Sequence, residues 1–206
     1  MRQDIASLLS WHSANKRNFP WRDPKVGPFH VLIAETLLRR TAANRVAPVF
    51  QTIVANYPRP EDLSRARMSE LKRVLYPLGL SSRAAHLKIL GAEIEERGRV
   101  PTEVTELVEL PLVGDYTARA VLLTLGSGHQ IPIDANILRI VRRVWGGRPL
   151  SFYDAQLNHW GKDAQRDTFF ALLDLGALIC RPIRPKCSVC PLSDYCIYAR
   201  SNARLD

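Results

Sequence analysis

All four cysteines of the chain, Cys180, Cys187, Cys190 and Cys196, lie in one segment with the spacing C-x6-C-x2-C-x5-C. Thiols in this pattern can form two disulfides, hold a zinc ion or ligate an iron–sulfur cluster. The N-terminus is polar and has no secretory signal pattern, which disfavours disulfides because cytosolic thiols stay reduced. Zinc sites usually pair two short knuckles, and only Cys187 and Cys190 form one. The spacing favours a [4Fe-4S] cluster and leaves zinc open.

A second chemical feature is the segment LVELPLVGDYTARAVLLTLG. We expect a helix to end at Leu110-Pro111, a tight turn over residues 112–114, and a new helix from about Tyr116 with Asp115 as its cap. Such a turn directs backbone N–H groups toward one point beside a positive helix N-terminus, which suits a phosphate. The alternative is an ordinary connector, since Pro and Gly turns between helices are common.

Asp134 is the third feature, because it follows the apolar Ile131-Pro132-Ile133 and precedes a helical pattern, with Asn136 two residues on. Its simplest role is that of a helix N-cap. A carboxylate after an apolar stretch can also be buried and chemically active, so both roles stay open.

The elements that must position these residues are helices. Apolar residues recur with helical spacing through most of the chain, Pro and Gly stand at the joints, and no strand pair with a hairpin turn is evident. The sequence therefore predicts an all-α fold. Lys and Arg exceed Asp and Glu, 29 against 20, for a net charge of +9. This excess favours a nucleic-acid partner, although a merely basic soluble protein fits the charge as well.

In combination these motifs resemble the helix-hairpin-helix DNA glycosylases of the endonuclease III superfamily. The resemblance rests on LPxVGxxTA, on Asp134-x-Asn136-x-x-Arg139 behind Pro132, and on the cysteine spacing, in that order. It extends upstream and covers most of the chain. The upstream matches are Phe19-Pro20-Trp21-Arg22, Glu35-Thr36-Leu37-Leu38-Arg39-Arg40-Thr41 and Leu78-Gly79-Leu80-Ser81-Ser82-Arg83-Ala84.

The resemblance implies two helical lobes with a DNA-binding cleft between them. One is a central lobe of residues 22–130 with the helix-hairpin-helix, and the other joins residues 1–21 to the cluster-bearing residues 131–206. It assigns the four cysteines to a [4Fe-4S] cluster. The expected partner is double-stranded DNA containing a mismatch. We further expect a monomer with no membrane association, cytoplasmic and at the nucleoid in a prokaryote.

The family's chemistry depends on the side chain that matches Tyr116. Members that also cut the strand carry a Lys there, which forms a Schiff base with the sugar. A phenol forms no imine, so the resemblance implies a monofunctional, mismatch-specific N-glycosylase; the alternative is that Tyr116 merely packs. Thymine glycosylases acting opposite guanine carry Tyr at this position, and adenine glycosylases acting opposite guanine or 8-oxoguanine usually carry Ser. We therefore expect removal of thymine or uracil opposite guanine, with the adenine reaction as the alternative.

By the same resemblance Asp134 would stabilise an oxocarbenium-like sugar and orient or deprotonate water, and Glu35 would donate to the departing base if burial raises its pKa. The alternative is that Glu35 lies on the solvent-exposed face of its helix and has no catalytic role. A DNA-binding protein without catalysis is the remaining alternative, although it would have little use for both carboxylates.

Matches to the family's DNA contacts are Leu80 as a wedge, Arg40 as a partner of the orphaned guanine, Arg39, and the hairpin residues Leu112 and Gly114. Leu80 as a loop core residue and Arg40 as a phosphate contact are the competing roles. Leu112 departs from the family pattern, which has Gly there. A positive φ at this position would cost about 1 kcal/mol or more with Leu.

Overall fold

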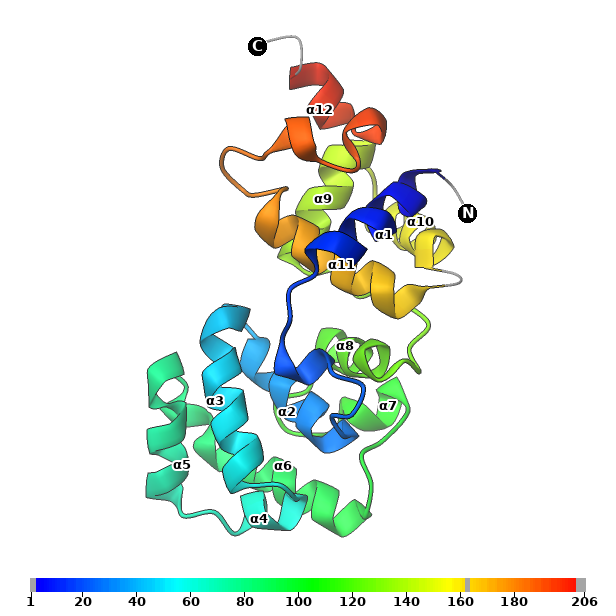
Figure 1. The fold of residues 1–206 in the computed structure, drawn as a ribbon. Coiled ribbons are helices and arrows are strands. Elements are labelled where there is room, and N and C mark those ends of the chain that lie inside the picture. The colour runs from blue at the N-terminus through cyan, green and yellow to red at the C-terminus, as the bar shows by residue number, and fades with distance from the viewer. Residues whose placement is uncertain (1–2, 162–163, 203–206) are drawn as a thin grey trace. The chain divides into compact units, whose positions relative to one another are not determined.

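The structure, a computed structural model, describes residues 3–161 and 164–202. These residues form α-helices, short 3-10 helices and connecting turns, and no β-strand occurs in either range. The predicted all-α fold is confirmed. The chain divides into two compact units, Asn18–Ser127, here the middle unit, and Met1–Arg17 with Gly128–Asp206, here the terminal unit (Figure 1). The boundaries expected from the sequence lay at residues 21/22 and 130/131.

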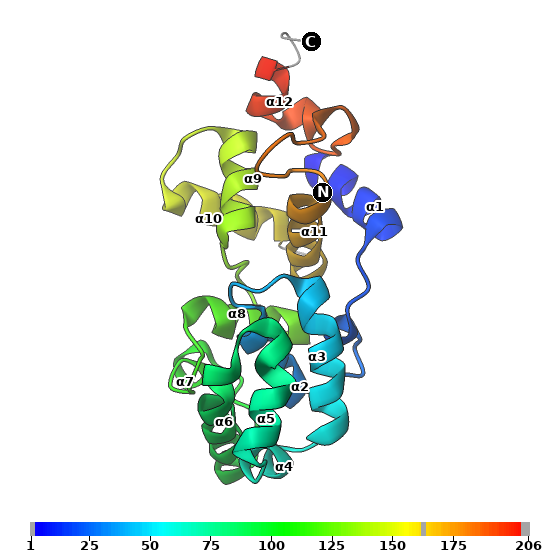
Figure 2. The same ribbon diagram turned by 90° about the vertical axis from the view of Figure 1, so that its left-hand side faces the viewer.

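The middle unit is organised around helix α2, Pro28–Leu38, which is buried on nearly all sides. Helices α3 and α8 and the 3-10 helix η1 pack against it (Figure 2). A helix that is apolar all round belongs in a core, so the polar side chains it carries are buried with it. The other elements of this unit are η1 Pro20–Arg22, α3 Ala43–Asn56, α4 Pro60–Ser64, α5 Met68–Leu75, η2 Tyr76–Leu78, η3 Ser81–Arg83, α6 Ala84–Arg97, α7 Val104–Leu107 and α8 Asp115–Leu125.

The terminal unit is built on α9, Ala135–Trp145, and α11, Gln165–Leu178, which pack together. The buried residues of α9 are Ile137, Ile140, Val141 and Val144, which fall on one face at helical spacing. The other elements are α1 Gln3–Asn15, α10 Leu150–Gly161, η4 Cys187–Val189, η5 Ser193–Tyr195 and α12 Ile197–Asn202.

The N-terminal segment is held in the terminal unit by buried polar contacts. Asp174 on α11 is fully buried and accepts hydrogen bonds from the backbone N–H of Arg17, at 2.9 Å, and from its Nε, at 2.7 Å. The Nε2 of His12 lies 3.3 Å from the same carboxylate. At the far end of α1, the indole N–H of Trp160 donates to Asp4 at 3.0 Å. Residues far apart in sequence thus form one packed unit.

The apolar spacing of the sequence predicts helices through most of the chain, but not over residues 60–64, 150–161 and 197–202, where the structure has α4, α10 and α12. Helix α4 has five residues, too few to show a period. Helix α10 does carry a signal, because Tyr153, Leu157 and Trp160 are buried and spaced four and three residues apart.

No helix in the described ranges is long and apolar enough to cross a bilayer.

Candidate active site and cluster loop

The predicted turn between two helices is present, with different boundaries. Helix α7 ends at Leu107, not at Leu110, and α8 starts at Asp115 with Gly114 as its N-cap. The expectation that Asp115 caps α8 was wrong, because its carboxylate instead pairs with Arg119 one turn on, at 2.9 Å. That hydrogen bond lowers the pKa of Asp115. The turn itself closes through hydrogen bonds from Leu110 N to Leu107 O and from Val113 N to Leu110 O.

Leu112 occupies the left-handed backbone region with φ of 68°. L-residues with a Cβ pay about 1 kcal/mol or more there, and glycine does not. The concern raised by the missing glycine is therefore confirmed. Gly114 has an extended backbone with φ of −107°, which any residue adopts, and a Cβ added to it would meet nothing within 4 Å. The residue of the turn with a left-handed backbone is therefore Leu112, and Gly114 has an ordinary extended backbone.

Glu35 on α2 is buried, which excludes the solvated alternative. The hydroxyl of Thr124 on α8 donates to Glu35 Oε1 at 3.3 Å. Burial raises the pKa of Glu35 to about 7, against the opposing influences of this hydrogen bond and of the Arg22 guanidinium. At neutral pH the side chain is therefore divided between a proton donor and a carboxylate.

Tyr116 lies in the first turn of α8 and is half-buried. Thr124, which binds Glu35, is eight residues further along the same helix, about 12 Å at the rise of an α-helix. Helix α8 therefore presents Tyr116 at its N-terminal end and supports Glu35 near its C-terminal end.

Asp134 belongs to the terminal unit and caps helix α9, as the sequence predicted. Its Oδ1 accepts the backbone N–H of Ile137 at 2.7 Å, and its Oδ2 accepts the Asn136 side-chain amide at 3.0 Å. Asp134 is half-buried, between the exposed cap and the buried carboxylate that the sequence left open. Both oxygens have a donor that fixes the orientation of the carboxyl group.

The hydrogen bonds around Asp134 continue to the cysteine segment. Asn136 Oδ1 accepts from Arg139 Nη2 at 2.9 Å, and the same guanidinium donates to the carbonyls of Gly176, at 2.9 Å, and Cys180, at 2.8 Å. A Cβ at Gly176 would lie 3.0 Å from the Cβ of Asn136, so glycine allows this close packing.

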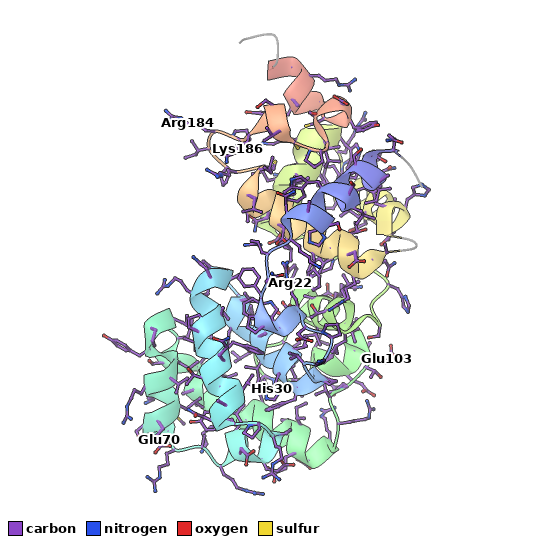
Figure 3. All side chains as sticks on the ribbon, viewed as in Figure 1. Arg22, His30, Glu70, Glu103, Arg184 and Lys186 are labelled. Atoms are coloured by element: carbon purple, nitrogen blue, oxygen red, sulfur yellow. The ribbon has the colours of Figure 1, made fainter. Side chains whose placement is uncertain are left out.

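The four cysteines form a loop that begins after α11 and ends before α12. Cys187 and Cys190 bound the 3-10 helix η4, and none of the four forms a disulfide. In the same loop Arg184 and Lys186 are exposed and project from the chain before η4 (Figure 3). Within the described ranges, no three His, Cys, Asp or Glu side chains converge as they would on one metal ion.

The donor set of this loop fits an iron–sulfur cube, in which each iron takes one thiolate. Burial raises the pKa of Cys190 to about 11, and the charges of the other three cysteines act in the same direction. Four thiolates in one loop therefore require positive charge nearby, which the iron atoms of a cluster supply. Arg143 adds more, since its Nη1 lies 3.3 Å from Cys180 Sγ and its guanidinium stacks 4.8 Å from the Tyr198 ring.

The residues expected to contact DNA all lie in the middle unit. Arg39 and Arg40 follow α2 and are exposed, and Arg40 has a left-handed backbone with φ of 60°. Arg39 Nη1 donates to Leu112 O at 2.9 Å and so connects the end of α2 to the hairpin. Leu80 follows Gly79, whose φ is 72°, and is partly buried against the core of this unit.

Sequence reasoning missed several residues that support these positions. They are Thr124 beside Glu35, Arg83 beside the end of α2, and Arg143 beside Cys180. Arg83 stands three residues after Leu80 within a matched segment, which was a usable signal. The contact of Thr124 with Glu35 joins residues 89 positions apart and left no local pattern.

Comparisons with known proteins agree with this arrangement. Residues 33–154 match the HhH-GPD superfamily of base excision DNA repair proteins, and residues 180–196 match the iron-sulfur binding domain of endonuclease III. The chain is 35% identical to a thymine-DNA glycosylase of Aeropyrum pernix, covering 93% of this chain and 92% of the relative. It is 33% identical to an adenine DNA glycosylase of Mycobacterium tuberculosis, of which it covers 66%.

A solved structure of a thermostable thymine-DNA glycosylase superposes with a TM-score of 0.87 at 31% identity, covering 96% of this chain and 95% of that one. The matched cluster domain begins at Cys180 and ends at Cys196, so the protein carries a [4Fe-4S] cluster in the segment that holds the four cysteines. The chain belongs to the HhH-GPD superfamily of base excision DNA repair proteins, as a DNA-binding N-glycosylase with the iron–sulfur domain of endonuclease III.

Proposed function

We propose that this protein is a monofunctional glycosylase that hydrolyses the N-glycosidic bond of thymine or uracil mispaired with guanine in double-stranded DNA. The observation that carries the proposal is Tyr116 in the first turn of α8, where strand-cutting relatives carry Lys. A phenol forms no Schiff base with the sugar, so the reaction stops at base release. The thymine-DNA glycosylase relative supports the choice of base, because the match spans 92% of its length.

Asp134 supplies the negative charge that the reaction requires. Departure of a base leaves an oxocarbenium-like sugar, and a fixed carboxylate stabilises that cation without reorganising. The hydrogen bonds from Ile137 and Asn136 hold the carboxyl group in one orientation. Its half-exposed position leaves room for the attacking water, which Asp134 orients or deprotonates.

Glu35 assists the departing base. Its raised pKa of about 7 provides a neutral carboxyl group that donates a hydrogen bond to the leaving pyrimidine. Thymine and uracil depart as anions stabilised by hydrogen bonds, so this assistance is weaker than full protonation. We assign Glu35 a secondary role and Asp134 the primary one.

The middle unit binds the DNA. The open backbone at Gly114, with no side chain in the way, admits a phosphate beside the N-terminus of α8. Leu80 enters the space left by the extruded base, and Arg40 pairs with the edge of the orphaned guanine. Extrusion is least costly at a mispair, which favours mismatched sites over intact duplex.

The test is incubation of the purified protein with duplexes that carry T, U or A opposite G or 8-oxoguanine, followed by alkali. We expect release of T and U opposite G to exceed release of A by at least about tenfold, or 1.4 kcal/mol in the transition state. Uracil should leave faster than thymine because it lacks the methyl group. Borohydride should not trap the protein on DNA, and strand breaks should require alkali or heat.

Removal of adenine is the second candidate, and one observation favours it. A carboxyl group with a pKa near 7 is well suited to protonate the adenine ring, which needs protonation more than a pyrimidine does. The adenine glycosylase relative has the same level of identity but is longer than this chain. Faster release of adenine than of thymine in one sequence context would replace the first proposal with this one.

A further inference from the structure

Arg83 contacts the end of helix α2 at two carbonyls. It closes η3, three residues after Leu80, and its Nη1 donates to Thr36 O at 2.8 Å while its Nη2 donates to Arg39 O at 3.4 Å. The last carbonyls of a helix have no partner within the helix and form the negative end of its dipole. A guanidinium with two parallel donors is suited to such a pair of acceptors.

Contacts of this kind connect three segments expected to meet DNA. Arg83 joins the loop carrying Leu80 to the end of α2, and Arg39 joins the end of α2 to the hairpin through Leu112 O, at 2.9 Å. The backbone N–H of Arg83 also donates to Leu80 O at 2.8 Å, which fixes the loop on the side of the wedge. The guanidinium groups of Arg39 and Arg83 thus connect the loop that carries Leu80, the end of α2 next to Arg40, and the hairpin.

The positive charges of Arg39, Arg40 and Arg83 repel one another, so their arrangement does not serve the stability of the fold. Burial lowers the pKa of Arg83, and the positive charges of Arg39 and Arg40 lower it further. In the part of the chain that the structure describes, none of these three arginines forms an ion pair with an acidic side chain. Carbonyl groups hold the Arg39 and Arg83 guanidinium groups, and Arg40 adds a third positive charge close enough to act on Arg83. Three such cations repel one another until an anion arrives, and DNA is the polyanion that this protein binds.

Arg40 depends on this arrangement. Its left-handed backbone, with φ of 60°, is a conformation that L side chains adopt only when the surroundings hold it. The carbonyl of the preceding residue, Arg39, is held by Arg83, and the following turn is closed by Thr41 N donating to Leu38 O at 3.1 Å. The contact with Arg83 therefore helps to hold the peptide group that precedes Arg40.

We propose that Arg83 is a positioning residue that couples insertion of the Leu80 wedge to recognition of the opposite guanine by Arg40. The proposal rests on the proposed function, because it assumes that Leu80 and Arg40 meet the mispair. Glu35 immediately precedes Thr36, so the same contact also secures the turn of α2 that carries Glu35. Loss of Arg83 impairs discrimination and catalysis while general affinity for DNA is retained.

The experiment compares the full-length, iron-loaded wild type with Arg83→Met, Arg83→Lys and the control Arg67→Met. Arg67 lies in the same unit, is mostly exposed and pairs with Glu70, so its replacement removes the same charge without touching α2. For each protein one measures the single-turnover rate on T opposite G and on T opposite A, the Kd for an undamaged duplex, and Tm.

We expect Arg83→Met to slow release of T opposite G by about tenfold or more at saturating enzyme, and to narrow the preference for G over A as the opposite base. The Kd for undamaged duplex should change no more than in Arg67→Met. Arg83→Lys should recover part of the rate, because an ammonium reaches one carbonyl but not both. Recovery by Lys distinguishes positioning from a general loss of folding.

The proposal is overturned if Arg83→Met matches Arg67→Met in both rate and opposite-base preference, or if only Kd or only Tm changes. Failure of the proposed function has a different signature, since the wild type itself would then release no T or U opposite G. Should the wild type release adenine instead, the same four proteins are compared on A opposite 8-oxoguanine and A opposite T. The expected and contradicting outcomes for Arg83 remain the same.

Discussion

At the scale of single residues, the two candidate catalytic carboxyl groups differ in their surroundings. Glu35 lies inside the core of the middle unit with one hydroxyl donor, and Asp134 is half-exposed at a helix start with two donors. Burial favours the neutral form of a carboxyl group, and hydrogen-bond donors favour the ionised form. The two groups are therefore suited to opposite tasks, proton donation and charge stabilisation.

Replacement of Asp134 by Asn should abolish base release and preserve folding. An amide oxygen still caps α9, since Asn is as good an N-cap as Asp, but the charge facing the oxocarbenium is lost. We expect the single-turnover rate to fall by at least about a thousandfold, with DNA affinity and Tm nearly unchanged. Gel-based base-release and binding assays measure both quantities.

Asp115→Asn is the matched control, because Asp115 also lies at the start of a helix and its carboxylate is paired with Arg119. It should keep most of the activity. A drop of only a few-fold in Asp134→Asn would restrict Asp134 to the role of a helix cap.

Glu35 should make the stability of the protein depend on pH. The folded protein holds the Glu35 proton up to a pKa of about 7, whereas the unfolded chain releases it near 4.5. This raised pKa contributes stability that is complete below pH 4.5 and is lost as the pH rises through about 7. The change in the free energy of unfolding caused by Glu35→Gln should therefore depend on pH. We expect this change to be more stabilising at pH 8 than at pH 4 by roughly 3 kcal/mol.

Urea unfolding from pH 4 to pH 8 measures this difference. Glu103→Gln, at an exposed position of the same unit (Figure 3), is the control and should show no comparable trend. In the same proteins the rate of base release by the wild type should decline above about pH 7, and Glu35→Gln should lack this decline. Equal pH dependence of stability in wild type and Glu35→Gln would contradict the assignment.

At the scale of elements, the hairpin has the expected left-handed backbone position, but leucine occupies it instead of glycine. Leu112 has the left-handed backbone that glycine would adopt without strain, and its side chain packs partly against the core of the middle unit. Packing of the leucine and its contact with Arg39 through the carbonyl hold a strained conformation in place.

Paired substitutions separate strain from packing at this position. Leu112→Ala and Leu112→Gly both remove the packed side chain, but only Ala keeps the Cβ. We expect the Gly variant to be more stable than the Ala variant by about 1 kcal/mol, the reverse of their usual order. Thermal unfolding of both proteins measures the difference.

The comparison pair is Ala85 and Ala85→Gly, at an exposed site in α6, where Gly should be less stable by a similar amount. If Leu112→Ala proved more stable than Leu112→Gly, the left-handed conformation at the turn would be refuted.

At the scale of the whole molecule, the terminal unit joins both ends of the chain and the cluster loop. Asp174 secures the N-terminal segment, while Arg139 and Arg143 bind carbonyls that flank Cys180. These contacts therefore hold the start of the cluster loop against α9. Its hydrogen bonds from Cys180 O through Arg139 and Asn136 to Asp134 place the cluster loop and the candidate catalytic carboxylate in one connected network.

The purified protein should be brown, with absorbance near about 400 nm and about four irons and four sulfides per chain. Iron and sulfide analysis of anaerobically prepared protein measures the content. Cys190→Ser should lose much of the iron, since it removes one of the four thiolates, whereas Ser193→Ala in the same loop should retain it. A colourless anaerobic preparation with stoichiometric zinc would contradict the cluster.

The sequence by itself determined the helical class, the order of the motifs and the cap at Asp134. Each of these depends on residues a few positions apart: Asp134 caps α9 because Ile137 is three residues on, and the apolar spacing of α9 repeats within one turn. The resemblance to the family, which has Gly at this position, also pointed to Leu112 as the position of strain in the hairpin. The helix ends were less accurate, since the last turn before Pro111 is not helical and Asp115 pairs with Arg119.

Only the tertiary structure decided which polar groups are buried and what holds them. The burial of Glu35 follows from helices packing around α2, and its donor Thr124 comes from a helix 89 residues away. Likewise, the carbonyls that Arg83 binds become neighbours only when the loop after Leu80 folds against the end of α2. Burial, pKa and such side-chain contacts depend on distances between segments remote in sequence, and these distances leave no pattern in the local spacing of residues.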